Sequence, residues 1–511
     1  MLVQLFSRLI LVTVVGMVGL PICAAAQADD SPIKIEINLD RTTGPLDHIW
    51  SKSAGSDRAA ISLREQWRKD LSRFHEETGL ERVRFHGIFA DELGVYAPST
   101  LNRLKEPNWQ NIDRVYDGLL ERGVKPFVEL SFMPKHLASG TAAFGFYRGN
   151  VTPPNDMAEW GMFIKAFTQH LVDRYGIDEV RGWMFEVWNE PNLKFFWLGT
   201  QEQYFDLYRE TVNAIKSVDN QLIVGGPSTS AIQWIPEFLA YAEKNNLPVD
   251  FVSTHIYAAD NQKKIFGKDK AYSQNDIIPA AMALARKQID QSKYKGTPLW
   301  LTEWSSDSPA MIAHVIKGCL GVCAAMSHWV FSNTYEELGV SSYVLKEGNN
   351  GFGMIAPAGI PLPQFNTYKL LHRLGKTRLA TSNGPVLASR LENGATAVAV
   401  WNLAEASQAG GIPGETWERK VVGETKQLRV ILKGAKPEAS VRVSFVDRER
   451  GSPFPEWRRL GSPQYPTVSQ IEQIRQSAEL SEPTTMTLNK KGELLLELPP
   501  EGIALVELDA S

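Results

Sequence analysis

The sequence is poor in cysteine and has no cluster of Cys and His residues at the spacing of metal ligands. Its three cysteines are Cys23, Cys319 and Cys323. Cys319 and Cys323 stand four residues apart in a stretch with a helical pattern, and this spacing rarely suits a disulfide. We therefore expect two buried free thiols, no metal site and no other cofactor.

The sequence also lacks an excess of basic residues. After its first residues it has no long apolar run. The 54 Lys and Arg residues are outnumbered by 58 Asp and Glu residues, which gives a net charge of −4. A mildly acidic surface argues against nucleic acid as a partner. Beyond the first residues, no segment approaches the roughly 20 apolar residues that a transmembrane helix needs. We expect no membrane partner for the mature chain.

The N-terminal segment has the pattern of an export signal. Arg8 precedes an apolar run from Leu9 to Leu20, and small residues follow up to Ala28. This pattern predicts a signal peptide over residues 1–28 and an exported protein, periplasmic or extracellular. The bulky Ile22 before Cys23 does not suit a lipid anchor. Removal of the segment, which holds one Arg and no acid, takes the net charge from −4 to −5.

Between about Ile49 and Gly375, short apolar runs alternate with amphipathic stretches. The stretch Ser62–Thr78 is one predicted helix, with Leu63 among the residues of its apolar face; a second, Asp156–Tyr175, starts at a capping aspartate. Eight strand-like runs are found: Ile49–Ala54, Arg82–Phe85, Lys125–Leu130, Gly182–Trp188, Gln221–Gly225, Asp250–His255, Pro298–Glu303 and Ser327–Phe331.

Eight such pairs predict an α/β fold, a (β/α)₈ TIM barrel over residues 45–375, because parallel strands need helical crossovers and closure removes the sheet edges. A doubly wound open sheet is the alternative. It would be expected to have a glycine-rich phosphate loop after its first strand, and the segment 53–57, Ser-Ala-Gly-Ser-Asp, is not one.

After Gly375 the helical period gives way to alternating strands. We expect an all-β, sandwich-like accessory domain over residues 376–511, with residues 29–44 adding an N-terminal strand to it. Within this region Thr467–Leu480 reads as one helix, and Pro453–Pro466 reads as an irregular, proline-rich loop.

Polar residues end several of the predicted strands, at the edge where a barrel carries its active site. Glu190 follows the fourth strand and Glu303 ends the seventh. A carboxylate at the end of a buried strand is costly unless it is paired or functional. Two carboxyl groups that face each other across a barrel mouth suit a retaining glycosidase, which needs one group as acid and one as nucleophile.

At these residues the chain resembles family 39 of the glycoside hydrolases, whose known members include β-xylosidases and α-L-iduronidases. The resemblance covers about residues 45–375 well and the C-terminal region more weakly. It is carried, in order, by the motifs Arg84-Phe85-His86-Gly87-Ile88-Phe89, Glu129-Leu130-Ser131-Phe132-Met133-Pro134, Gly149-Asn150-Val151-Thr152-Pro153-Pro154, Phe185-Glu186-Val187-Trp188-Asn189-Glu190-Pro191-Asn192-Leu193, the pair His255 and Tyr257, and Phe331 with Glu336-Glu337.

The resemblance implies roles for individual residues. Glu190 would be the general acid/base and Glu303 the nucleophile, with Asn189 bound to the sugar 2-hydroxyl. Tyr257 would donate a hydrogen bond to Glu303. The other expected substrate contacts are His86, His255, Trp329, Phe146, Phe196, Glu336 and Glu337, whereas Glu129 and Glu186 are expected to be buried structural partners.

Within the family, a uronic-acid enzyme is expected to carry a cation where this chain has Tyr257, and the nearest candidates are Arg148 and Lys346. We therefore predict an exo-acting β-D-xylosidase that releases xylose from xylo-oligosaccharides or other glycosides. An arabinose-releasing or endo-acting member of the family is the alternative enzyme, and an inactive carbohydrate-binding barrel is the alternative from another class. The oligomeric state is left open.

Overall fold

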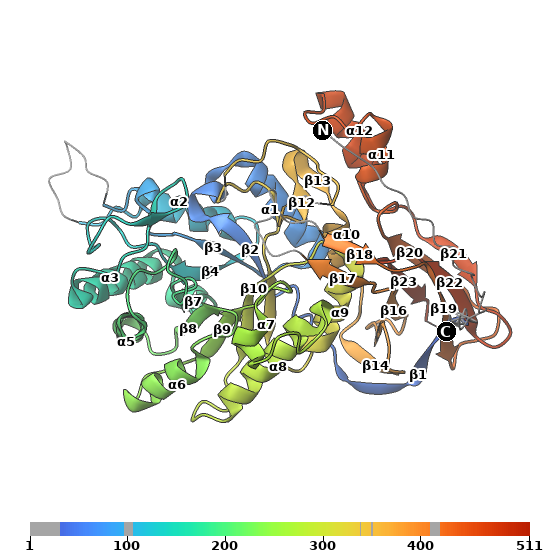
Figure 1. Cartoon of the computed structure of the whole chain (residues 1–511), viewed down its shortest axis with the longest axis horizontal. Helices are drawn as coiled ribbons and strands as arrows, with labels where there is room; N and C mark the ends of the chain where they lie inside the picture. The colour runs from blue at the N-terminus through green and yellow to red at the C-terminus, as the bar shows by residue number, and fades with distance from the viewer. Residues whose placement is uncertain (1–30, 97–105, 338, 349–350, 409–418, 511) are drawn as a thin grey trace, which may run out of the picture.

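The computed structural model describes residues 31–96, 106–337, 339–348, 351–408 and 419–510. A barrel of parallel strands surrounded by helices lies beside a large, mostly antiparallel sheet (Figure 1). None of the helices in these described ranges is long and apolar enough to cross a membrane. The predicted signal peptide lies outside the described residues.

The barrel confirms the predicted fold class. It closes in the order β10-β11-β2-β3-β4-β7-β8-β9, so that the strands follow one another around it in chain order. Its strands are β2 (Ser53–Arg58), β3 (Arg82–His86), β4 (Lys125–Leu130), β7 (Met184–Val187), β8 (Ile223–Ser230), β9 (Phe251–His255), β10 (Leu299–Trp304) and β11 (Ala325–His328).

Helices cover the outside of the barrel because each has one apolar stripe to bury. On α1, Trp67, Leu71 and Phe74 are buried, whereas Leu63 precedes the helix in a 3₁₀ turn and is 38% exposed, contrary to its predicted place on the buried face. The main barrel helices are α1 (Glu65–Thr78), α2 (Gln110–Leu120), α3 (Met157–Tyr175), α5 (Gln201–Val218), α6 (Ile235–Lys244), α8 (Ile277–Asp290), α9 (Pro309–Cys319) and α10 (Pro363–His372).

Smaller elements decorate the barrel. The loop after β4 holds a two-stranded hairpin, and Cys319 and Cys323 are both free and buried near the end of α9. The short elements are β5 (Ala143–Phe144), β6 (Gly149–Asn150), α4 (Ile177–Val180), α7 (Gln262–Phe266), β12 (Ile355–Ala356) and β13 (Ile360–Pro361).

β2 and β8 differ most from their predicted bounds, because buried polar groups find partners inside the protein, and β11 begins two residues earlier and ends three residues earlier than predicted. The first strand runs over Ser53–Arg58 instead of Ile49–Ala54, and all six of its residues are buried. Ser56 accepts a hydrogen bond from the Trp67 indole, and Asp57 accepts one from the backbone of Glu337 at 3.0 Å. Similarly, β8 continues through Ser230 beyond the predicted end at Gly225.

The accessory region is one continuous nine-stranded sheet, in the order β21-β20-β23-β16-β15-β14-β1-β19-β22, and not two separately bonded sheets. Side chains from strands along the whole sheet form one apolar cluster, so the sheet curls over a common core. Its strands are β1 (Ile33–Pro45), β14 (Thr377–Thr381), β15 (Val386–Arg390), β16 (Thr396–Trp401), β19 (Lys426–Lys433), β20 (Ser440–Val446), β21 (Thr484–Thr487), β22 (Glu493–Leu498) and β23 (Ile503–Leu508).

The first described strand, β1, is an interior strand of this sheet. It pairs antiparallel with β14 and parallel with β19, and Figure 1 shows it in blue among the orange and red strands. The sheet packs against the barrel through β16, on which Ala397, Ala399 and Trp401 join the barrel's core. The two parts therefore share buried apolar surface.

Outside the main sheet, the segment predicted as an irregular loop, Pro453–Pro466, contains a short helix, α11 (Phe454–Arg459). A proline in the first turn favours this helix, and Arg459 pairs with Glu456 one turn earlier. The one helix predicted in this region, Thr467–Leu480, is found as α12 (Val468–Ser477). β17 (Glu405–Gln408) and β18 (Arg419–Val422) pair antiparallel in a separate two-stranded sheet.

Candidate active site

The turn after β7 places Glu190 at the mouth of the barrel. Trp188 and Glu190 both have left-handed backbone conformations, with φ of 70° and 41°. Non-glycine residues in this region are strained, and such strain gathers at functional sites. The turn is held by a hydrogen bond from the Glu190 backbone N–H to the Ser228 carbonyl at 2.8 Å. The sharp turn carries the Glu190 carboxyl group into the mouth.

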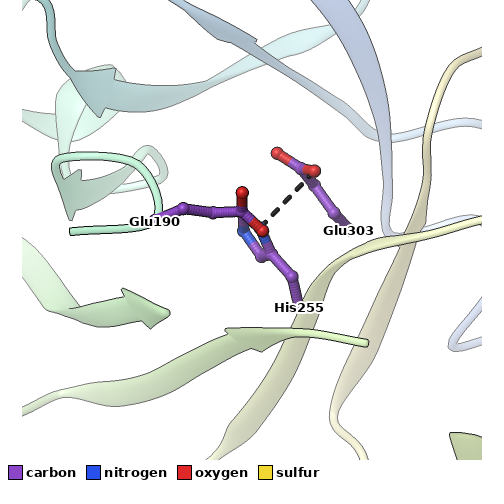
Figure 2. Close-up of side chains that lie close together, drawn as sticks. All are labelled: Glu190, His255 and Glu303. Atoms are coloured by element: carbon purple, nitrogen blue, oxygen red, sulfur yellow. Dashed lines mark hydrogen bonds and ion pairs between the residues drawn. The ribbon is translucent and has the colours of Figure 1, made fainter. Parts of the chain in front are cut away.

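Glu190 and Glu303 face each other there, with His255 beside both (Figure 2). One carboxylate oxygen of each lies within 4.8 Å of the other and of a His255 nitrogen. His255 Nδ1 is 3.0 Å from Glu190 Oε1 and 3.4 Å from Glu303 Oε2. The short separation of the two carboxyl groups fits the roughly 5–5.5 Å of retaining glycosidases and leaves no room for the water of an inverting mechanism.

Arg84, on β3, is the central cation of the site and is fully buried. Its guanidinium donates to Glu186 Oε2 at 2.6 Å, to Glu303 Oε1 at 2.8 Å and to Asn189 Oδ1 at 2.9 Å. It also lies 2.9 Å from Glu129 Oε2. Burial disfavours the charge, but the carboxylates of Glu186, Glu129 and Glu303 outweigh it and hold the Arg84 pKa well above its ordinary value.

Glu303 receives two strong donors. Besides Arg84, the Tyr257 hydroxyl donates to Glu303 Oε2 at 3.0 Å, which confirms the expected hydrogen bond. Both donors stabilise negative charge on this carboxylate, because charge-assisted hydrogen bonds to an anion are stronger than those to a neutral acid. The arrangement suits a carboxylate that attacks as an anion.

Glu190 is in a different environment. Arg84 pairs with Glu129, Glu186 and Glu303, whereas the basic group beside Glu190 is His255, with its Nδ1 3.0 Å away. Burial lowers the pKa of His255 to about 4, so this ring is neutral near pH 7. Burial raises the pKa of Glu190 to about 7, although a hydrogen bond with Ser230 and the charge of His86 oppose the shift. A carboxyl group with this pKa can both give and take a proton near neutral pH.

His86 lies on the other side of the site, two residues after Arg84 on the same face of β3. Its Nδ1 is 2.7 Å from Glu129 Oε2, and its Nε2 is 3.5 Å from Glu337 Oε1. Burial lowers the pKa of His86, but Glu129, Glu337 and Glu303 raise it to about 9. His86 is thus a charged donor whose Nε2 points between the carboxylates of Glu303 and Glu337.

His255 has protein neighbours at both ring nitrogens. Its Nδ1 lies against the two carboxylates, and its Nε2 lies 3.4 Å from the Ser228 hydroxyl. This geometry makes His255 a partner of Glu190 and Glu303, and its expected contact with a sugar hydroxyl stays a prediction.

Asn189 and Trp329, two of the other predicted substrate contacts, are both buried in the site. Asn189 uses its oxygen on Arg84, while its buried Nδ2 has no hydrogen-bond partner among the described residues. Trp329 is 3% exposed, and its ring centroid lies 4.6 Å from that of His86. Gly55 makes room for this indole, since a Cβ there would come within 2.5 Å of the ring.

Glu336 and Glu337 follow β11 and are both buried, but they have different partners. Glu336 pairs with Arg58 at 3.2 Å and with Arg64. Glu337 accepts from the Tyr335 hydroxyl at 2.8 Å, and burial raises its pKa to about 8. Of this pair, Glu337 is therefore the one that faces His86.

The two predicted aromatic walls also differ. Phe196 is 5% exposed and lies against His86 with 5.8 Å between ring centroids. Phe146 is 57% exposed, and its ring lies 5.2 Å from the guanidinium carbon of Arg58. Phe196 belongs to the inner wall, whereas Phe146 lies at the rim.

Sequence reasoning missed the importance of Arg84 and Arg58. Arg84 appeared only as part of a motif, although its charge on an apolar strand, two residues before His86, was a usable signal. Arg58 ends a strand that was predicted four residues too early, and no pattern pointed to it. Glu129 and Glu186 are found as expected, buried and bound to Arg84.

The oxygen and nitrogen atoms of Glu190, His255 and Glu303 could in principle ligate a metal ion. Arg84, however, already donates to Glu303, and the charged His86 lies 3.9 Å from the same carboxylate. These two positive groups compensate the charge that would attract a cation. The donor set therefore fits carboxylate chemistry better than metal binding.

Comparison with known proteins agrees with this geometry. The model of "Glycosyl hydrolases family 39" matches residues 33–494. A "Beta-xylosidase" from Caldicellulosiruptor saccharolyticus is 36% identical over 472 residues, which cover 88% of this chain and 92% of the relative. The human "Alpha-L-iduronidase" is 23% identical, over 91% of this chain and 76% of its own length.

Among solved structures, a "monomeric beta-xylosidase" from Caulobacter crescentus superimposes with a TM-score of 0.82. It is 31% identical, and the match covers 94% of this chain and 99% of that one. The likeness therefore includes the accessory sheet as well as the barrel.

The charge of His86 gives a testable dependence of stability on pH. A histidine whose folded pKa is raised to about 9 contributes stability that is complete below pH 6.5 and is lost as the pH rises through 9. Glu129→Gln removes the largest raising charge, so the part of this fall that His86 contributes, on the order of 1–3 kcal/mol, should become much smaller. The parts contributed by Glu190 and Glu337, whose pKa values burial raises to about 7 and about 8, should remain. Urea unfolding at a series of pH values would measure it.

Glu186→Gln is the matched control for this experiment, because it removes another carboxylate from Arg84 but leaves Glu129 beside His86. It should keep the fall in unfolding free energy between pH 6.5 and 9. An unchanged fall in Glu129→Gln would mean that His86 is not charged by Glu129.

Proposed function

Because this chain belongs to family 39 of the glycosyl hydrolases, we propose that it is a retaining, exo-acting β-D-xylosidase. The observation that carries the proposal is the close pair Glu190 and Glu303, in which one carboxyl group has a pKa of about 7 and the other receives Arg84 and Tyr257. The higher identity to a β-xylosidase, 36%, than to an iduronidase, 23%, supports xylose as the glycone.

In the proposed reaction, Glu303 attacks the anomeric carbon while Glu190 gives its proton to the leaving oxygen. The bond to the leaving group breaks as the bond to Glu303 forms, which leaves a glycosyl-enzyme ester and a deprotonated Glu190. Glu190 then takes a proton from water, whose oxygen displaces Glu303 and restores both carboxyl groups. Two inversions at the anomeric carbon give net retention.

The charges around the site support a neutral sugar. Arg84 is bound by carboxylates on several sides, and Arg58 is paired with Glu92 at 2.8 Å and with Glu336. Arg148 and Lys346, the cations considered from the sequence, are both exposed. A uronic acid would therefore bring a carboxylate into a site whose described cations already have partners, and buried unpaired charge is costly.

We also propose that the chain is exported. The support for this part is the pattern of residues 1–28 alone: a basic residue, an apolar run and small residues before the expected cleavage point.

Chemical rescue tests the nucleophile. Glu303→Ala should lose turnover of aryl β-xylosides by several orders of magnitude, and azide should restore it, because a small anion can fill the face that the carboxylate vacated. The product should be the glycosyl azide of inverted configuration, identified by NMR. Rescue with the same stereochemistry in Glu190→Ala, and not in Glu303→Ala, would reverse the two assignments.

The acid role of Glu190 predicts a pH effect with a definite sign. Since the acid must carry its proton, kcat/KM for xylobiose should fall as the pH rises through about 7. Glu190→Ala should remove this limb and lower kcat/KM for xylobiose by about 10²–10⁴-fold, but spare cleavage of xylosides with activated leaving groups. Pre-steady-state release of the leaving group measures this step. Equal losses on both substrates would rule out an acid role.

Specificity should follow from the paired cations. A glucoside adds a hydroxymethyl group, which costs about 1–3 kcal/mol where it fits poorly, so xyloside should be preferred modestly. An α-L-iduronide adds a buried charge and should react more slowly by orders of magnitude. Values of kcat/KM on matched aryl glycosides test this order, and comparable values for xyloside and iduronide would contradict the assignment of xylose.

A further inference from the structure

A strip of aromatic rings runs from the floor of the site to the surface. The Trp329 and His86 rings are 4.6 Å apart, the His86 and Phe196 rings 5.8 Å, and the Phe196 and Phe195 rings 4.8 Å. The first three side chains are 3%, 1% and 5% exposed, whereas Phe195 is 54% exposed. The strip therefore connects the buried pocket with solvent through a continuous series of ring contacts.

A second loop completes the outer end of this strip. Phe144 lies in the β5–β6 hairpin, with its ring 4.4 Å from that of Phe196 and 6.0 Å from that of Phe195. Phe195 and Phe196 come from the loop after β7, so two separate loops bring three phenylalanines together. We call Phe144, Phe195 and Phe196 the outer ring cluster.

The outer ring cluster is fixed relative to Glu190. The Leu193 backbone N–H donates to the Glu190 carbonyl at 2.9 Å, and the Phe196 N–H donates to Leu193 at 3.0 Å. The Trp188 indole donates to the Phe196 carbonyl at 2.9 Å. The same short loop thus carries the proton donor of the proposed reaction at one end and the exposed ring at the other.

This position decides which part of a substrate the cluster meets. A general acid protonates the oxygen of the leaving group, so the leaving group lies on the side of Glu190. The glycone lies deeper, between Trp329, His86 and the two carboxyl groups. Phe195 stands five residues after the acid and is the exposed end of the strip, so its ring is available to a leaving group that departs on this side.

We propose that Phe195, with Phe144 and Phe196, forms the leaving-group subsite and that this subsite favours a flat, apolar aglycone, such as an aromatic ring, over a second sugar. The proposal rests on the function proposed above. Phenylalanine offers a broad apolar face but no hydrogen bond, whereas a sugar has hydroxyl groups to satisfy.

The neighbouring polar groups agree with this choice. Lys194, the residue before Phe195, folds back on its own loop, where its Nζ donates to the Gly199 carbonyl at 3.0 Å. Arg58 lies against the rings of Phe146 and Tyr147 and is held by Glu92 and Glu336. Both cations therefore already have partners within the protein.

The test compares three substrates of the same glycone: phenyl β-xyloside, methyl β-xyloside and xylobiose. Phe195→Ala should lower kcat/KM for phenyl β-xyloside by about three- to ten-fold, the range expected for one lost aromatic contact. It should leave methyl β-xyloside unchanged and affect xylobiose less than the phenyl substrate. Phe195→Trp should keep the phenyl preference, because it keeps a ring in place.

A control and a second readout separate this role from a structural one. Met162 on α3 is also exposed, at 65%, and Met162→Ala should change none of the three substrates. In competition between benzyl alcohol and methanol for the glycosyl-enzyme, Phe195→Ala should lower the ratio of benzyl to methyl xyloside formed. This ratio does not depend on which donor made the intermediate.

Each outcome has one reading. A loss confined to the phenyl substrate, with a lower benzyl ratio, supports the proposal. A loss greatest on xylobiose would assign the cluster to a sugar, and an equal loss on all three substrates would make Phe195 structural; either would overturn the proposal and leave the xylosidase function intact. Failure of the unaltered protein to hydrolyse any of the three xylosides would instead overturn the proposed function, and this proposal with it.

Discussion

The buried guanidinium of Arg84 is the interaction on which the active site depends. A cation without solvent contact is tolerable only if several anions or dipoles surround it, and Glu129, Glu186, Glu303 and Asn189 do so from three different places in the chain. The dependence is mutual, because without Arg84 these buried carboxylates would lose the positive charge that they share. Closure of the barrel brings them together, since β3, β4, β7 and β10 meet around one mouth.

The same cation separates the two carboxyl groups chemically. Glu303 receives Arg84 directly, whereas Glu190 stands beside a neutral His255 in a buried position, and its pKa rises to about 7. Two identical side chains a short distance apart thus have different hydrogen-bond partners, and these suit one to attack as the nucleophile and the other to exchange a proton. His86 and Glu337 repeat this pattern on the glycone side, where a charged imidazole faces a carboxyl group whose pKa is about 8.

Much of the fold and of the active site could be predicted from the sequence, wherever the local residue pattern agrees with the environment that the folded protein supplies. β4 has its predicted bounds because an apolar strand is buried on both faces, and Glu190 and Glu303 stood out as acids at strand ends. The prediction failed at β2, because its polar residues are typical of a loop. They form a buried strand because distant groups supply partners, such as the backbone of Glu337 for Asp57. The contacts of His255 were likewise invisible, because they depend on where Ser228 and two distant glutamates meet.

The place of β1 in the accessory sheet makes this sheet slow to form during synthesis. Its neighbours, β14 and β19, lie more than 300 residues later, so both edges of β1 stay without their partners until most of the chain has left the ribosome. Closing so long a loop is entropically costly, and contacts of such sequence separation form late in folding. Until then β1 is a strand with an apolar face and two unpaired edges. Such a segment pairs readily with other chains, so a chaperone that binds the nascent chain would protect it best at β1.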